Sequence, residues 1–225
     1  MTRAIIFDLD NTLIDFVETK NLVIQESVKA MIDAGLKANY ESLLKEFSSY
    51  YWKHGIEEQK IFQKFLKQKY GKIDYKILAH AILAYRKTKN GLLSPYPGAK
   101  NMLIALKEKG LKLAILSDAP RLEAYLRLCS VGFDDFFDVI LTKDDTKSIK
   151  PHAKGFLLAA KKLGVNPKDC VMVGDRPEKD IIGAKNLGMK TIFAKYGNVN
   201  AKSNEADATA NDVSDIAKIV TKGDF

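Results

Sequence analysis

The sequence predicts an α/β protein with a three-layer core around a central parallel sheet, plus a small all-helical domain inserted into that core. The first observation is a set of short, continuous apolar runs that end in polar residues. The second is that helical patterns separate the later runs, so strand and helix alternate. The third is the stretch 16–90, which carries helical patterns and no convincing strand.

The apolar runs are expected to be strands buried on both faces, because they do not alternate with polar residues. The strands are expected at 4–8, 113–117, 139–142, 171–174 and 191–194, and the helices between the later ones at 99–109, 121–130, 153–163 and 178–187. Glycines stop three of these helices, at Gly110, Gly164 and Gly188. Right-handed crossovers between parallel strands then give a Rossmann-like core.

The inserted stretch reads as four helices. They are expected at about 17–34, 40–53, 57–70 and 75–89, with stops at Gly35, Gly55, Gly71 and Gly91. Apolar residues recur there at helical spacing, for example at Ile77, Leu78 and Ala81. Because the segment 94–98 is a Pro- and Gly-rich return, residues 1–15 and 94–225 are expected to form the core and residues 16–93 the helical domain.

Composition narrows the class of protein. Hydrophobic residues make up 46% and charged residues 28%, as in ordinary globular chains. No apolar run approaches the ~18 residues of a membrane span, and acid at Asp8 excludes a signal peptide, so a cytoplasmic protein is expected. The net charge of +8 is spread over scattered lysines, which argues against a nucleic acid as partner, and without an apolar span no membrane partner is expected either. Cys129 and Cys170 are expected to be buried, reduced thiols.

Polar residues gather where the predicted strands end. They are Asp8-Leu9-Asp10-Asn11-Thr12 after the first strand, Ser117-Asp118 after the second, Lys150-Pro151 beyond the third, and Gly174-Asp175 with Asp180 after the fourth. Ligands of an open parallel sheet bind outside these carboxyl ends. Several carboxylates at one edge repel each other, so a lysine and a cation are expected to balance them. Oxygen ligands that include carboxylates favour Mg²⁺.

In their order and spacing these segments resemble the four motifs of the haloacid dehalogenase superfamily. The matching residues are Phe7-Asp8-Leu9-Asp10-Asn11-Thr12-Leu13, Leu116-Ser117, Lys150-Pro151 and Gly174-Asp175 followed by Asp180. The resemblance covers residues 1–15 and about 94–197, and the helical insert is similar to the family's cap domain. It implies a Mg²⁺-dependent phosphatase that hydrolyses a small phosphorylated metabolite through an aspartyl-phosphate.

The resemblance also implies roles for single residues. Asp8 would be the nucleophile, and Asp10 would be the general acid for the leaving alcohol and then the base for water. Thr12, which would help hold Asp10, belongs with Ser117, Asp118 and Lys150 to the phosphate-binding set. Mg²⁺ would lie between Asp8, the backbone carbonyl of Asp10 and Asp175, with Asp180 orienting the metal site from behind.

Several assignments have alternatives. Lys143 and Lys147 compete with Lys150 for the phosphate. Thr12 and Asp180 are also suited to cap the helices that follow them. Asp118 stands where the family often has Asn, and its side chain adds a negative charge near the phosphate. His152 is expected to be exposed. In the insert, candidates for a substrate-facing surface are Tyr50, Tyr51, Trp52, Lys53, His54 and Arg86, although aromatic residues in a helical bundle more often form its core.

The alternative functions are a 2-haloacid dehalogenase and a phosphomutase, which would use the same nucleophile. Dehalogenation needs neither a metal nor a leaving-group acid, so Asp10 and Asp175 argue against it. A non-catalytic binding module on the same fold is the alternative of another class. Because no catalytic group is missing, the phosphatase is the leading interpretation, as a monomer or a homodimer.

Overall fold

The computed structural model describes residues 2–54, 58 and 60–222. The chain forms two compact units, which we call the core unit (Met1–Asp15 and Ser94–Phe225) and the helical unit (Phe16–Leu93). The core unit contains β1 (Ala4–Phe7), α5 (Ala99–Glu108), β2 (Lys112–Leu116), α6 (Arg121–Ser130), β3 (Val139–Leu141), α7 (Lys143–Thr146), α8 (Ala153–Leu163), β4 (Cys170–Gly174), α9 (Ile182–Lys185), β5 (Lys190–Ala194), β6 (Ala208–Ala210) and α10 (Asp215–Thr221).

The core unit is built on a parallel sheet with strand order β3-β2-β1-β4-β5-β6. From β1 the chain steps outward through β2 and β3, and it then crosses back to β4 on the other side of β1. Ala4 therefore pairs with both Lys112 and Cys170. The order of the strands reverses between β1 and β4, and in such sheets this switch point is where ligands bind.

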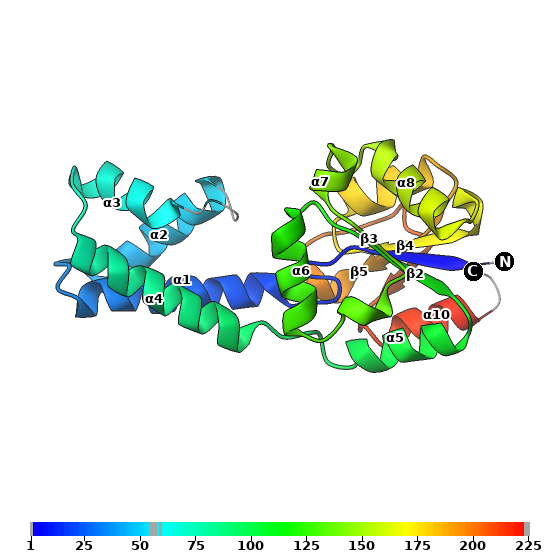
Figure 1. The fold of residues 1–225 in the computed structure, drawn as a ribbon, viewed down its shortest axis with the longest axis horizontal. Helices are drawn as coiled ribbons and strands as arrows, with labels where there is room; N and C mark the ends of the chain where they lie inside the picture. Colours follow the sequence, from blue (N-terminus) through cyan, green and yellow to red (C-terminus); the bar gives the residue numbers. More distant parts are fainter. Residues whose placement is uncertain (1, 55–57, 59, 223–225) are drawn as a thin grey trace. The chain divides into compact units, whose positions relative to one another are not determined.

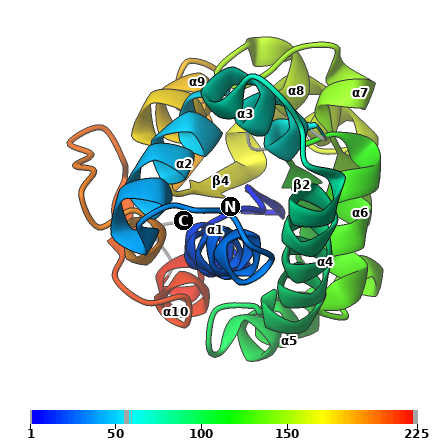
Figure 2. The same cartoon turned by 90° about the vertical axis from the view of Figure 1, so that its left-hand side faces the viewer.

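Helices cover both faces of the sheet. Ile6 of β1 and Met172 of β4 pack against Phe156 and Leu163 of α8. Their neighbours along the strands, such as Ile5, point to the opposite face and are also buried. Figure 2 shows α8 and α9 on one side of β4, and α5 and α10, which contact each other, on the other side. The predicted three-layer α/β core is confirmed.

The helical unit consists of α1 (Phe16–Asp33), α2 (Tyr40–His54), α3 (Ile61–Tyr70) and α4 (Tyr75–Leu92). Figures 1 and 2 show α1 and α4 side by side, and they make the most extensive helix contact in the unit. The helical unit has a hydrophobic core of its own. In this core the ring of Phe47 from α2 stacks on Phe62 and meets Phe65 edge-on. The unit therefore has a core separate from that of the sheet.

Two segments differ from the expectation. The polar tail contains a sixth strand, β6, which pairs with β5 in parallel. Asp207, just before β6, accepts hydrogen bonds from the backbone N–H and the hydroxyl of Thr191 in β5. The three residues of β6 form no apolar run, so no sequence pattern predicts this strand. The helix expected at 178–187 is a π-helical turn, Pro177–Ile181, that leads into the short α9.

The glycine stops are correct in the core unit and only partly correct in the insert. Gly110, Gly164 and Gly188 have φ of 74°, 67° and 74°, the left-handed conformation that ends a helix. Gly91 is not a stop, because α4 continues through it to Leu92. The stop at Gly55 and the helix start at Glu57 lie outside the described residues. Among the described helices, none combines the length and the apolarity that a membrane crossing requires.

Candidate active site

The turn after β1 places Asp8 at the switch point. The backbone N–H of Asp8 donates to the carbonyl of Val173 in β4 at 2.9 Å, so the aspartate still belongs to the sheet edge. Asn11 then adopts a positive φ of 58° and donates to Ile14 at 2.7 Å, which reverses the chain. The turn leaves Asp8 buried beside the end of β4.

Three buried carboxylates meet there. Asp8 comes from the end of β1, Asp175 follows β4, and Asp180 lies on the π-helical turn. One carboxylate oxygen from each lies within 4.8 Å of the others. The buried ammonium of Lys150 pairs with Asp8, and it pairs with Asp180 at 2.7 Å. We call these four residues the carboxylate cluster.

The electrostatics of this cluster favour an added cation. Burial, together with the charges of Asp8 and Asp180, raises the pKa of Asp175 to about 8. Burial also raises the pKa of Asp180 to about 6, although Lys150 opposes that rise. Burial alone would lower the pKa of Lys150, but Asp180 and Asp8 outweigh burial and raise it. One ammonium therefore does not balance three carboxylates.

An oxygen of Asp175 that has no described partner also indicates that the cluster suits a divalent metal ion. Among the described residues, the buried Oδ1 atom of Asp175 has no hydrogen-bond partner. A buried carboxylate oxygen without a partner costs free energy unless a cation or a water reaches it. Buried carboxylate oxygens are the donors that Mg²⁺ prefers, so the residues present fit this ion.

The side chain of Asp10 points to a different partner. Its Oδ2 atom accepts from Nη1 of Arg127 in α6 at 2.6 Å, and the Arg127 side chain is 1% exposed. Arg127 is not among the site residues predicted from the sequence. The only signal available was its place on the buried face of α6 with Ala124 and Leu128, where an arginine needs an anionic partner.

Ser117 and Asp118 follow β2 at the same edge. Ser117 is buried, and its backbone N–H donates to Leu141 at 2.9 Å while its hydroxyl accepts from Ala119 at 3.1 Å. The Asp118 side chain holds two lysines: Oδ1 accepts from the backbone N–H of Lys150 at 2.9 Å, and Oδ2 pairs with Lys179 at 2.8 Å. The negative charge of Asp118 therefore has a counter-charge, which sequence analysis missed.

The structure distinguishes between alternative assignments that the sequence left open for the lysines and for Thr12. Lys150 contacts Asp8, whereas Lys147 is exposed in a left-handed turn. Thr12 is buried four residues before α1 begins, so it does not cap that helix. In the described part of the chain its hydroxyl has no hydrogen-bond partner, while its carbonyl accepts from Tyr196 at 2.6 Å.

Asp180 and His152 also have defined contacts. Besides its pair with Lys150, Asp180 accepts from the backbone N–H of Arg176 at 3.0 Å, so it serves the cluster and its own turn together. His152 is exposed, as expected, and its Nδ1 accepts from Lys154 at the start of α8. Cys129 is exposed on α6 rather than buried, a correction to the expectation, whereas Cys170 is buried in β4.

Two glycines allow close approach of backbone to this site. A Cβ on Gly174 would lie 2.3 Å from a carboxylate oxygen of Asp180. A Cβ on Gly197, which follows β5, would lie 1.6 Å from the carbonyl oxygen of Asn11. Any larger residue at either position would displace a loop that carries the site.

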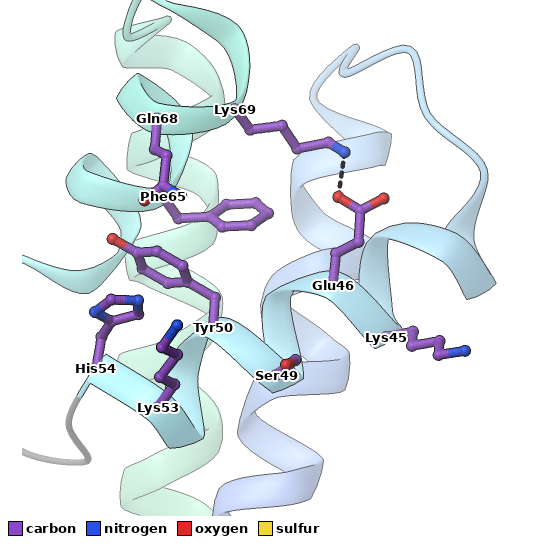
Figure 3. A pocket seen from close by; sticks show the side chains of 9 residues that line it. All are labelled: Lys45, Glu46, Ser49, Tyr50, Lys53, His54, Phe65, Gln68 and Lys69. Atoms are coloured by element: carbon purple, nitrogen blue, oxygen red, sulfur yellow. Dashed lines mark hydrogen bonds and ion pairs between the residues drawn. The ribbon is translucent and has the colours of Figure 1, made fainter.

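A hollow lies within the helical unit, between α2 and α3 (Figure 3). It has a volume of about 550 Å³, and three of the substrate-surface candidates, Tyr50, Lys53 and His54, line it. Among the described residues that line it, the single acid is Glu46, which is paired with Lys69 across the hollow. Because the lining contains no group of carboxylates, this hollow lacks the chemistry of the carboxylate cluster. Tyr51 is buried in the hydrophobic core of the unit.

Known proteins are similar to this chain in sequence and in fold. A family model described as haloacid dehalogenase-like hydrolase matches residues 2–188. A glyceraldehyde 3-phosphate phosphatase from Methanocaldococcus jannaschii is 34% identical over 98% of this chain and 97% of its own. A phosphoglycolate phosphatase from Aquifex aeolicus is 29% identical over 97% and 96%. The crystal structure of a phosphatase from Thermococcus onnurineus matches with a TM-score of 0.70 and 27% identity, over 98% of each chain.

Proposed function

The chain belongs to the haloacid dehalogenase-like hydrolase family and is a phosphatase of that family, and we propose that the carboxylate cluster is its active site. The observation that carries this proposal is the placement of Asp8 beside Lys150 and Asp175 at the switch point of the sheet. A phosphate monoester needs a nucleophile, a counter-charge for its oxygens and a proton for its leaving group. The residues of the core unit offer all three.

Asp8 attacks phosphorus in the first step. A bond forms between a carboxylate oxygen of Asp8 and phosphorus while the bond from phosphorus to the ester oxygen breaks. Asp10 donates a proton to the departing oxygen, so an alcohol leaves rather than an alkoxide. In the second step water attacks the aspartyl-phosphate, Asp10 takes a proton from that water, and Asp8 is released with inorganic phosphate.

The other residues hold the phosphoryl group during both steps. Lys150 neutralises charge on Asp8 and on the phosphoryl oxygens, and the hydroxyl of Ser117 and the backbone N–H of Asp118 donate to those oxygens. Asp8, Asp175 and the carbonyl of Asp10 would hold Mg²⁺, which supplies further charge neutralisation at the phosphoryl group when bound. Asp180 keeps Lys150 in place.

We propose a small phosphorylated metabolite as substrate, with three-carbon phosphates first among those to be tested. The relative from Methanocaldococcus jannaschii, similar over nearly the whole chain, is a glyceraldehyde 3-phosphate phosphatase. We further propose that the helical unit is the cap domain, and that the enzyme acts in the cytoplasm as a monomer or homodimer.

A substrate screen tests this proposal. Purified protein is assayed for phosphate release from glyceraldehyde 3-phosphate, phosphoglycolate, sugar phosphates, polyol phosphates and nucleotides, with Mg²⁺ and after removal of divalent ions by a chelator. The Asp8→Asn variant, purified in parallel, controls for contaminating phosphatases. We expect Mg²⁺-dependent release by the wild-type protein alone.

Two results would contradict the proposal. Release of halide from a 2-haloacid, with no activity on any phosphate ester, would identify a dehalogenase. Isomerisation of a sugar phosphate without release of phosphate would identify a mutase.

A further inference from the structure

We propose that Asp118 is a positioning residue for Lys150, and that Lys179 is the counter-charge that makes an aspartate tolerable at this place. The inference rests on the proposed function, because it assigns these residues to the same reaction. It goes beyond the family resemblance, which places Asn at this position and assigns no role to Lys179.

The contacts of Asp118 tie together the loops that follow three strands. Asp118 itself follows β2, Lys150 lies in the segment between α7 and α8 after β3, and Lys179 lies on the turn after β4. Each carboxylate oxygen of Asp118 has a separate partner, Lys150 N–H at 2.9 Å and Lys179 Nζ at 2.8 Å. The side chains of Asp118 and Lys179 are 25% and 22% exposed, so water screens this pair only in part.

The hydrogen bond from the backbone N–H of Lys150 to Asp118 holds the backbone from which the lysine side chain extends. A lysine side chain has four flexible carbons, so the position of its ammonium depends on a fixed backbone and fixed partners. At its far end the ammonium is held by Asp8 and Asp180. At its near end the residue that follows is Pro151, which has no N–H to donate. The N–H of Lys150 is thus an anchor that Asp118 holds.

The ammonium of Lys179 neutralises the negative charge that Asp118 brings to the site. A carboxylate at the edge that receives a phosphate dianion would repel the substrate. Lys179 is the residue before Asp180 on the same turn, so the element that delivers Asp180 to the cluster also delivers the counter-charge for Asp118. The Asp118–Lys179 pair therefore presents no net charge to the substrate.

Single variants separate the two roles. Asp118→Ala removes the anchor, and kcat is expected to fall about 10- to 100-fold, the usual effect of losing a group that orients a catalytic side chain. Asp118→Asn keeps an oxygen that accepts from the N–H of Lys150, so it is expected to restore most of kcat. Lys179→Met leaves Asp118 uncompensated, and KM for a phosphate dianion is expected to rise about 5- to 10-fold with kcat little changed.

A double variant tests the counter-charge. In the Asp118→Asn background no carboxylate needs neutralising, so adding Lys179→Met is expected to leave KM almost unchanged. If Lys179 bound the phosphate directly, Lys179→Met would raise KM equally in both backgrounds. Equal increases would overturn the assignment of Lys179.

The chain contains a matched control away from the site. Asp138 has the same two kinds of contact, accepting from the backbone N–H of Leu113 at 2.7 Å and pairing with Lys107 at 3.0 Å. Leu113 lies near the start of β2, at the edge of the sheet opposite the cluster. Asp138→Ala and Lys107→Met are expected to lower the melting temperature about as much as the Asp118 and Lys179 variants, with kcat and KM unchanged.

The assay uses the full chain, Mg²⁺ and p-nitrophenyl phosphate together with the best substrate of the screen. Activity of the wild-type protein and inactivity of Asp8→Asn establish the proposed function independently of Asp118. With that established, a kcat of Asp118→Ala equal to that of wild type would overturn the positioning role. A fall in kcat that Asp118→Asn does not restore would also overturn it.

Discussion

Four aspartates of the site differ in what their side chains contact. Asp8 pairs with Lys150, Asp10 with the buried Arg127, and Asp118 with Lys179. One oxygen of Asp175 has no hydrogen-bond partner in the described part of the chain. Aspartate thus supplies a proposed nucleophile, a proposed acid and base, a proposed anchor and a proposed metal ligand. The contacts of each side chain distinguish these proposed roles.

Asp10→Ala is expected to slow the reaction of alkyl phosphates much more than that of aryl phosphates. An alkyl alkoxide leaves poorly without a proton, whereas a nitrophenolate leaves without help, and general acid catalysis contributes about 10²- to 10⁴-fold. Formation of the aspartyl-phosphate, measured in a single turnover, is expected to fall by that factor for an alkyl phosphate and little for an aryl phosphate. Equal losses for both would show that Asp10 acts only through structure or metal placement.

Arg127→Met is expected to give a weaker form of the same signature. The guanidinium holds the carboxylate of Asp10 in one direction, so its loss leaves that side chain free to rotate, and the alkyl ester is expected to suffer more than the aryl ester. Because Asp10 is partly exposed, the loss of unfolding free energy is expected to stay below about 3 kcal/mol in urea titrations. Arg127→Lys, which keeps the charge, is expected to recover part of the alkyl activity. A loss that is identical for both esters would contradict this account.

At the residue scale, the meeting of Asp8, Lys150 and Asp175 could be predicted from the sequence, because the ends of parallel strands converge at one edge. Their chemical roles remain predictions. Arg127 and Lys179 could not be found in the same way. Arg127 lies in the middle of a helix, and Lys179 is one of many lysines in a Lys-rich chain. Only the folded positions of Asp10 and Asp118 identify their partners.

At the scale of elements, the site depends on two segments that pass close to each other. Gly197, in the turn after β5, lies against the Asn11 turn that follows Asp8. The alternation of strands and helices predicted the two strands, β1 and β5, but not the contact between the turns that follow them. Contacts between loops follow from distances, and a sequence pattern carries no distances.

Gly197→Ala is expected to abolish most activity and to lower the melting temperature. The added Cβ would overlap the carbonyl oxygen of Asn11, so the turn that places Asp8 must move. The matched control is Gly91→Ala in α4, where no other described atom, outside the adjacent residues and the backbone of the helix itself, lies within 4 Å of the added Cβ. That substitution is expected to be neutral or to stabilise the protein by up to about 1 kcal/mol, because alanine favours a helix. Full activity of Gly197→Ala would contradict the packing described here.

Two short segments could not be predicted correctly from the sequence: β6 and the turn at Pro177–Ile181. The buried strands were predictable from continuous apolar runs, whereas β6 was not, because its three residues form no such run and its place is set by backbone pairing with β5. The turn at Pro177–Ile181 had a helical pattern, but its backbone instead carries Asp180 to Lys150. Periodicity therefore predicted a helical segment here, but not its π-helical form or the contact that it places beside Lys150.

At the scale of the whole molecule, stability and activity are expected to share a requirement for metal. Three buried carboxylates with one ammonium repel each other, and a ligand that binds only the folded state stabilises it by mass action. Mg²⁺ is therefore expected to raise the melting temperature, increasingly with its concentration. In Asp175→Asn this shift is expected to be much smaller, because one of the proposed ligands loses its charge. The measurement is thermal unfolding at several Mg²⁺ concentrations, and an equal shift in both proteins would contradict the proposed metal site.

Covalent phosphorylation of Asp8 is the step on which the proposed function most directly depends. The measurement is an acid quench of a single turnover with phosphate-labelled substrate, followed by proteolysis and mass spectrometry of the labelled peptide. The wild-type protein is expected to carry acid-stable, hydroxylamine-sensitive phosphate on Asp8, and Asp8→Asn is expected to carry none while retaining its fold by circular dichroism. Phosphate on another residue, or turnover by Asp8→Asn at the wild-type rate, would contradict the mechanism.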